Sequence, residues 1–153
     1  MIEFKKKEVK FLESLEEARM ATSHRNIPHV KPVSFVFHEN LIIVATDYKT
    51  KSFRNIKLNP NTSIVIDIYK SGAHKAICIQ GEIEIIESGK EFEKYYNIFY
   101  EKFQWVRNDP WNEKEAPFLK IIPKNKTSWG VIKKDFKNNL KLISVKKLFY
   151  FIS

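Results

Sequence analysis

Six side chains that could bind an anion are concentrated within nine residues of the sequence. The segment ATDYKTKSFRNIKLNPN, residues 45–61, contains three hydroxyl groups and three cations: Thr46, Lys49, Thr50, Lys51, Ser52 and Arg54. Hydroxyl and cationic donors suit a phosphate, and the free backbone N–H groups at the start of a helix add to them. The segment therefore predicts a phosphate site where a strand ends and a helix begins. On composition alone, a capped surface helix with exposed lysines explains these residues equally well.

Arg19 is a further candidate for the same anion. It stands at the start of an earlier predicted strand. A guanidinium can donate two parallel hydrogen bonds to one phosphate, which a lysine ammonium cannot do. We expect Arg19 to approach the phosphate from across the fold.

Other kinds of catalytic site have little support. The four histidines show no metal-ligand spacing, and with only four glycines the chain has no glycine-rich phosphate loop. Cys78 is the single cysteine, which excludes an internal disulfide and a cysteine-rich zinc site. Glu82 and Glu84 share the polar face of one predicted strand, where a solvated surface explains them better than acid/base chemistry. A hydrolase is not expected.

Hydrophobic periodicity predicts the elements that would position the candidate residues. Helices are predicted at 7–17, 50–58 and 90–106, and strands at 18–26, 29–37, 41–46, 62–69, 75–87 and from 118 onward. Thr50 is the expected N-cap of the second helix. Gly81 interrupts the most regular strand and indicates a bulge or a close approach. Six short strands with helices between some of them predict a mainly β fold, a six-stranded antiparallel barrel with flanking helices.

The composition is that of a globular protein with a basic end. The chain has 153 residues, 43% of them apolar, and a net charge of +9. From Lys120 onward nine lysines face one acid, Asp135, so this end alone carries +8. We therefore predict one domain over 1–130 and a lysine-rich extension over 131–153. The absence of a signal peptide or a membrane-spanning apolar run predicts a cytoplasmic protein. The extension is expected to be a solvated segment, which disfavours nucleic acid or a membrane as partner and leaves binding through its end, KKLFYFIS, as an alternative.

The order of five motifs resembles the FMN-binding split β-barrel family, the pyridoxamine 5′-phosphate oxidase-like flavoproteins. The motifs lie within residues 7–130 and are ARMAT (18–22), PHVKPVSFVF (28–37), ATDYKTKSFRNIKLNP (45–60), IQGEIEII (79–86) and IIPKNKTSW (121–129). The resemblance implies a split barrel that forms a homodimer, with FMN bound at the subunit interface. It also implies an oxidoreductase acting on a small molecule through the flavin N5.

The resemblance assigns cofactor contacts by position to four segments of the chain. The matching residues are Arg19, Met20, Ala21 and Thr22, then Pro32 and Val33, then Ala45 and Thr46, and finally Thr50, Lys51 and Ser52. Trp129 matches an aromatic position near the end of the domain. No catalytic side chain and no metal ligand is assigned, because the flavin would supply the redox chemistry. The aromatic helix at 90–106 is expected either to approach the cofactor cleft or to pack in the core.

Two departures from the family pattern leave alternatives open. The family usually has two adjacent basic residues where this chain has Lys51-Ser52, and Lys49 or Arg54 could supply the second cation. The chain lacks a match to the glutamine and C-terminal arginine of true pyridoxamine-phosphate oxidases, so that activity is not expected. A deazaflavin could replace FMN. A non-enzymatic flavin-binding or haem-binding barrel, with His24 or His29 as the haem ligand, is the alternative function.

Overall fold

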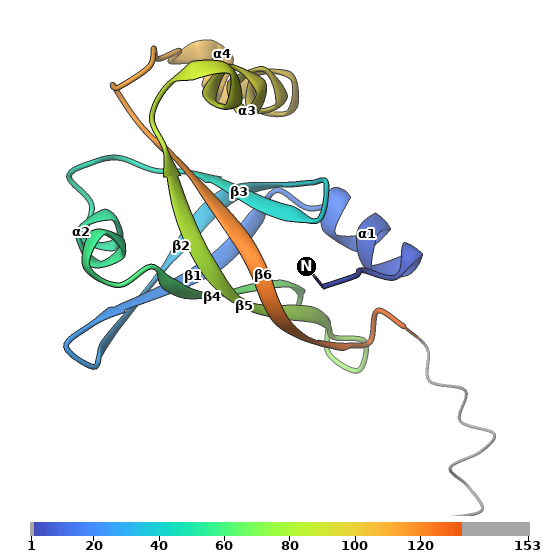
Figure 1. Ribbon diagram of the computed structural model, residues 1–153. Coiled ribbons are helices and arrows are strands. Elements are labelled where there is room, and N and C mark those ends of the chain that lie inside the picture. Colours follow the sequence, from blue (N-terminus) through green and yellow to red (C-terminus); the bar gives the residue numbers. More distant parts are fainter. Residues whose placement is uncertain (1, 133–153) are drawn as a thin grey trace, which may run out of the picture.

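Six antiparallel strands close into one barrel in the computed structural model, which describes residues 2–132 (Figure 1). The strands are β1 (Glu17–His24), β2 (Ile27–His38), β3 (Leu41–Ala45), β4 (Asn61–Ile68), β5 (Lys75–Ile86) and β6 (Phe118–Trp129). Their order around the barrel is β1-β2-β3-β6-β5-β4, and pairing of β4 with β1 closes it. The predicted six-stranded antiparallel barrel is confirmed.

Strict alternation of side chains builds the barrel interior. Successive residues of a strand point to opposite faces, so every second residue faces the barrel interior. On β5, Ile77 and Ile79 are fully buried while Gln80 is exposed. The predicted irregularity at Gly81 is present as a shift of register between Gln80 and Gly81 in the pairing with β6. A Cβ at Gly81 would collide with the backbone oxygen of Ile122, so only glycine fits there.

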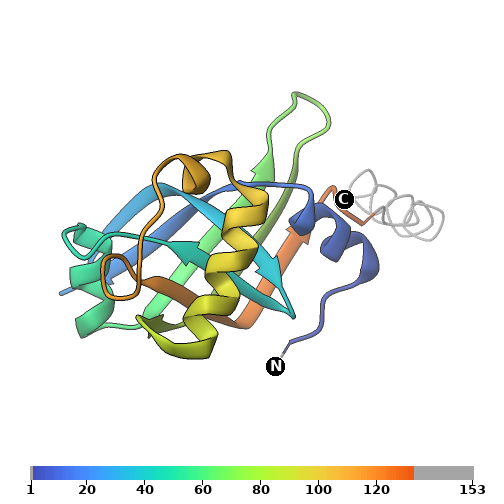
Figure 2. The ribbon, with the colours of Figure 1, turned by 90° about the horizontal axis from the view of Figure 1, so that it is seen from above.

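Four helices lie around the barrel within residues 2–132. They are α1 (Lys6–Glu13), α2 (Lys51–Leu58), α3 (Gly89–Lys102) and α4 (Gln104–Asn108). Figure 2 shows α3 lying across the outside of the barrel, with α1 and α2 near opposite ends. The first helix ends at Glu13, four residues earlier than predicted, and β1 begins at Glu17. Among residues 2–132, no helix has both the length and the apolar content needed to cross a membrane.

The predicted single helix at 90–106 is wrong in one respect, because it is two helices. Phe103 has an extended backbone (φ −112°, ψ 122°) that ends α3 and precedes α4. Phe103 and Val106 are both buried, so the break allows both side chains to reach the apolar cluster beneath them.

Two apolar clusters stabilise the described part of the chain. One fills the barrel and includes inward residues of all six strands together with Phe11, Leu12, Phe53 and Ile56 of α1 and α2. The other lies outside the barrel, where Phe92, Tyr95, Phe99 and Phe103 pack on Val36, Ile43 and Phe118. The buried aromatic side chains of α3 therefore act in core packing, which was one of the two roles expected for them. The predicted extension lies outside the described residues from 133 onward.

Candidate functional site

The junction between β3 and α2 is closed by a hydroxyl cap. Thr50 precedes the first residue of α2, and its Oγ1 accepts a hydrogen bond from the backbone N–H of Phe53 at 3.1 Å. The same hydroxyl donates to the carbonyl of Asp47 at 2.9 Å. The predicted N-cap is confirmed. It fixes the direction in which the first N–H groups of α2 point, and these are the groups that attract an anion.

Lys31 brings an ammonium group from a second strand to this junction. Its Nζ donates to Thr46 Oγ1 at 3.4 Å, and Thr46 Oγ1 lies 3.3 Å from Thr50 Oγ1. Burial lowers the pKa of Lys31, while the nearby Asp47 carboxylate acts in the opposite direction. Sequence reasoning missed Lys31. The sequence did contain a signal for it. Lys31 is two residues before Val33 on β2, so both side chains lie on the inward face of that strand.

The first turn of α2 contains hydrogen-bond donors and no acidic residue that would accept from them. Lys51 is exposed at its start. Ser52 is completely buried, and its Oγ has no hydrogen-bond partner among residues 2–132. A buried hydroxyl without a partner costs free energy, and native proteins usually satisfy it. The predicted residues Thr50, Lys51 and Ser52 thus occupy the cap and first turn of α2, and Lys51 is the exposed member of the three.

Arg19 lies on the outer face of β1 and makes its contacts there. Its guanidinium is 3.1 Å from the carboxylate of Glu17 and 3.3 Å from that of Asp67. Within the described part of the chain, no hydrogen bond or ion pair joins Arg19 to Thr46 or Thr50. Arg19 and the donors of the β3–α2 junction, which were predicted to bind one phosphate together, therefore do not contact each other within the described part of the chain.

The other predicted contacts divide according to the face they occupy. Met20 and Val33 are buried in the barrel interior, so an external ligand could reach only their backbone atoms. Thr22 is buried as well, and its hydroxyl accepts a hydrogen bond from Asn55 of α2 at 3.1 Å. Ala21 and Pro32 lie at outward positions and are accessible.

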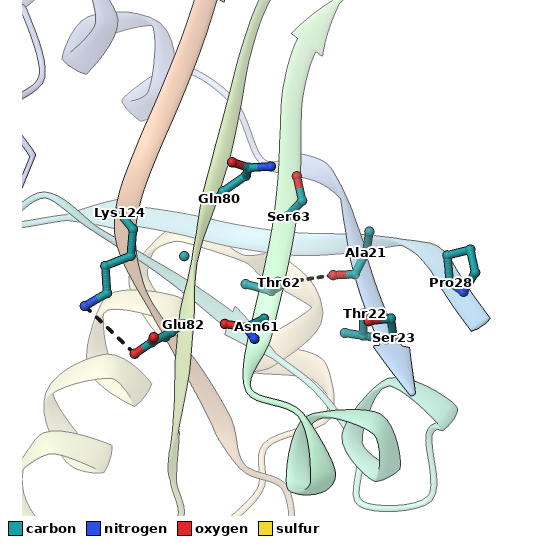
Figure 3. Close-up of a pocket in the computed structure, with 11 residues that line it drawn as sticks. Ala21, Thr22, Ser23, Pro28, Asn61, Thr62, Ser63, Gln80, Glu82 and Lys124 are labelled. Atoms are coloured by element: carbon teal, nitrogen blue, oxygen red, sulfur yellow. Dashed lines mark hydrogen bonds and ion pairs between the residues drawn. The ribbon is translucent and has the colours of Figure 1, made fainter. Parts of the chain in front are cut away.

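A hollow of about 410 Å³ lies on the outer face of β1, β4, β5 and β6 (Figure 3). Its volume is within the usual range for small-molecule pockets. Ala21 and Thr22 line it together with Ser63 and Gln80, which sequence reasoning did not select. Ser63 and Gln80 are cross-strand partners on β4 and β5, so a hydroxyl and an amide stand side by side at the wall. Their outward strand positions beside Gly81 were the available signal.

A smaller apolar pocket of about 170 Å³ adjoins the end of β3. Ala45 and Thr46 line it with Ala116 and two tryptophans. The indoles of Trp105 and Trp111 are nearly parallel, at an interplanar angle of 3° and a centroid distance of 5.8 Å. Thr46 therefore lies between an aromatic wall and the cationic junction.

Comparison with models of protein families identifies the family of this chain. A family model described as Pyridoxamine 5′-phosphate oxidase matches residues 4–127. The chain belongs to this family. The match covers the barrel up to the last two residues of β6, and it includes the β3–α2 junction and the outer-face hollow.

Solved structures share the fold of this pyridoxamine 5′-phosphate oxidase family member at low sequence identity. An FAD-binding protein from Mesorhizobium loti is 16% identical with a TM-score of 0.64, covering 78% of this chain and 88% of that one. A putative pyridoxamine 5′-phosphate oxidase from Listeria innocua is 16% identical with a TM-score of 0.63, covering 79% and 94%. HutZ, the haem-storage protein from Vibrio cholerae, is 16% identical with a TM-score of 0.68, covering 78% and 89%. No curated protein matches the chain in sequence.

The residues of the junction fit the phosphate of a nucleotide flavin, the type of cofactor typical of the pyridoxamine 5′-phosphate oxidase family. The fit depends on the buried Ser52 hydroxyl, which lacks a partner among the described residues, and on the exposed Lys51 beside it. Lys31 brings a second cation to this junction, where the Lys51-Ser52 pair has only one. Arg54 is less suited to that role, because its Nη1 donates to the carbonyl of Lys49 at 2.8 Å.

Proposed function

We propose that this chain is an FMN-binding oxidoreductase that acts as a homodimer on a small-molecule substrate. The observation that carries the proposal is the β3–α2 junction, where Lys51 is exposed and the Ser52 hydroxyl has no partner in the part of the chain that the structure describes. Flavin binding is typical of the family to which the chain belongs. When bound, the flavin supplies hydride transfer at its N5, and the protein contributes placement and exclusion of water.

The chain's own residues have distinct tasks in this proposal. Lys51, Ser52 and the first N–H groups of α2 hold the phosphate, and Thr50 caps the helix start that presents them. Lys31 keeps Thr46 in place and adds positive charge. The outer-face hollow receives the uncharged part of the cofactor against Ala21 and Gln80.

The proposed homodimer would cover the outer face of the β1–β2 hairpin. Val30 is exposed there, and Pro28 and Pro32 on the same face of β2 add apolar surface. The hairpin projects from the barrel in Figure 1. Clustered exposed apolar side chains often mark an interface. Light scattering after size-exclusion chromatography should give a dimer, and Val30→Glu should shift it toward monomer. A monomeric wild-type protein would contradict this part of the proposal.

The cofactor proposal is tested by titrating the purified protein with FMN. Protein that is yellow as purified, or a shift of the flavin absorption bands on adding FMN, is the expected result. Riboflavin is the control, since it lacks only the phosphate, and it should bind more weakly. Binding of a deazaflavin in place of FMN would keep the fold assignment and overturn the cofactor. A protein that leaves the FMN spectrum unchanged would contradict the proposal.

Haem binding is a second candidate, supported by two histidines and by the similarity to HutZ. His29 pairs with Thr22 across the hairpin and His24 pairs with Ile27, so the alternation of β1 puts both histidines on one face. A Soret band that appears with haem and is lost in His29→Ala would favour this function. A wild-type protein that gives no Soret band with haem, or a band that persists in His29→Ala, would count against this function.

A further inference from the structure

A further hollow, of about 470 Å³, lies between α3 and the segment that follows α4, and we call it the α3 hollow. Figure 2 shows this segment running back alongside α3. The volume is within the usual range for small-molecule sites. The α3 hollow shares no lining residue with the outer-face hollow, and none of the phosphate donors of the β3–α2 junction lines it. It is therefore a cavity that the proposed flavin function leaves unused.

Three aromatic side chains line the α3 hollow. Phe92 and Tyr96 are one helical turn apart on α3, and their rings are nearly parallel, at an interplanar angle of 18° and a centroid distance of 6.2 Å. The ring of Trp111 crosses that of Tyr96 at 78°, with the centroids 5.1 Å apart. Phe92 is buried, whereas Tyr96 and Trp111 are half-buried and accessible. Aromatic rings gathered at such angles can surround a cation, which is attracted to their faces.

Both charged side chains that line the α3 hollow are acidic. Glu93 belongs to α3 and Glu113 to the facing segment, and among residues 2–132 no lysine or arginine lines the hollow. Lys94, which follows Glu93 in the sequence, forms an ion pair with Glu39 at 2.7 Å. Glu113 Oε1 accepts a hydrogen bond from the backbone N–H of Gly89 at 2.6 Å, which leaves its negative charge in place. Two carboxylates disfavour an anion in this hollow and attract a cation.

Hydrogen bonds hold the facing segment in place. The indole N–H of Trp111 donates to the carbonyl of Ala116 at 3.2 Å. The backbone N–H of Asn112 donates to the carboxylate of Glu115 at 2.7 Å. Together with the bond from Gly89 to Glu113, these contacts fix the segment against the start of α3. A ligand that enters the α3 hollow would therefore lose little free energy in ordering its walls.

We propose that the α3 hollow binds an organic cation with a weakly hydrated head group, for which a trimethylammonium group is the model. The aromatic rings attract the head group, and the two carboxylates balance its charge. A primary ammonium is compact and strongly hydrated, so it gains less from such a site. The proposal does not depend on the flavin function, because the residues that line the α3 hollow are not those proposed to hold the cofactor.

Choline and 3,3-dimethylbutan-1-ol separate charge from shape, because the second compound replaces the cationic nitrogen of the first with carbon. Each is titrated against the full-length chain, and binding is followed by the NMR signal of its methyl groups. We expect choline to bind with a Kd of about 1 mM and the uncharged compound to bind at least about fivefold more weakly. Equal affinities would show a merely apolar pocket and would overturn the proposal. A Kd for choline above about 20 mM would overturn it as well.

Glu93→Gln and Glu101→Gln form a matched pair for the charge. Each removes one exposed carboxylate from α3, but only Glu93 lines the α3 hollow. Glu93→Gln should weaken choline binding about threefold, and Glu101→Gln should change it by less than about 1.5-fold. Glu113→Gln should resemble Glu93→Gln, since the glutamine oxygen can still accept from Gly89. Equal effects of Glu93→Gln and Glu101→Gln would show that choline binds elsewhere and would overturn the proposal.

Tyr96→Leu and Tyr96→Phe test the aromatic wall. The leucine variant retains apolar bulk without a ring and should weaken choline binding about fivefold, whereas the phenylalanine variant should stay within about twofold of wild type. Equal weakening by both would assign the effect to the hydroxyl group and contradict an aromatic site. Circular dichroism verifies folding, and if Tyr96→Leu is unfolded the two glutamate variants decide the matter. FMN affinity should be unchanged in every variant, so a failure of FMN binding would affect only the proposed function.

Discussion

Helices α1 and α2 both have eight residues and both pack on the barrel. They differ in the hydrogen bonding of the buried polar side chain in the first turn of each helix. Glu8 in the first turn of α1 is 2% exposed, and its carboxylate accepts hydrogen bonds from the Lys5 amide at 2.9 Å, from Ser128 at 2.9 Å and from Lys126. Ser52 in the first turn of α2 is 0% exposed and has no partner within residues 2–132. The buried side chain in the first turn of α1 thus has all its hydrogen-bond partners, whereas the one in the first turn of α2 is a donor without an acceptor among the described residues.

The difference predicts different roles for the two helix starts, stability for α1 and, in the proposed function, ligand binding for α2. A buried carboxylate with three donors links α1 to β6 and leaves nothing for another molecule. An unpartnered hydroxyl beside an exposed lysine is a cost to stability that a bound anion would relieve. Substitutions in α1 should therefore affect stability, and substitutions in α2 should affect binding.

The largest expected effect comes from Glu8→Ala. The change leaves Lys126 and Ser128 without their acceptor in a largely buried place, and we expect the free energy of unfolding to fall by about 3 kcal/mol. Urea unfolding of the cofactor-free protein measures it. Glu13→Ala is the control, since Glu13 is exposed on the same helix and its removal should cost less than about 0.5 kcal/mol. A loss below about 1 kcal/mol for Glu8→Ala would break the comparison.

Lys51→Ala should affect the ligand and leave the fold unchanged. Loss of a charge-assisted contact to the phosphate should weaken FMN binding about tenfold, and riboflavin binding should barely change. Fluorescence titration of both flavins measures the ratio. Equal weakening of the two ligands would place Lys51 away from the phosphate. A large fall in the unfolding free energy would show that α2 serves the fold as α1 does.

Thr50→Ala tests the cap that α2 uses for its own stability. Loss of the hydrogen bond to the Phe53 amide should lower the unfolding free energy by about 1 kcal/mol. Thr50→Ser retains the hydroxyl and should remain close to wild type. Thermal unfolding monitored by circular dichroism compares the three proteins. If serine and alanine are equally destabilising, the methyl group rather than the cap is the important feature.

The smallest effect should appear in the pH dependence of stability. Burial raises the pKa of Glu8, but hydrogen bonds from Lys126, the Lys5 amide and Ser128 outweigh it and hold this pKa below its usual 4.5. The contribution of Glu8 is therefore fully present above pH 4.5 and is lost as the pH falls through the lower value in the folded protein. The stability difference between wild type and Glu8→Gln should shrink across this acidic range. A difference that stays constant below pH 4.5 would exclude this coupling.

The sequence by itself determined the features that depend on near neighbours. The alternation of Ile77, Ile79 and Gln80 requires only a period of two, and it correctly predicted a half-polar strand. The Thr50 cap and the irregularity at Gly81 are likewise local, and both are present. The order of motifs also led to the family, which the match over residues 4–127 confirms. The cofactor contacts inferred from that resemblance stay predictions.

Only the tertiary structure decided which distant groups meet. Lys31 reaches Thr46 because β2 and β3 are neighbours, and Glu8 reaches Lys126 because α1 packs beside the end of β6. The contacts of Arg19 with Asp67 and of Asp67 with His74 require a closed barrel in one register. A shift of a single residue would turn each of these strand side chains to the opposite face. Register and closure are set by the sum of the core contacts, and for that reason no short stretch of the sequence could reveal these pairs.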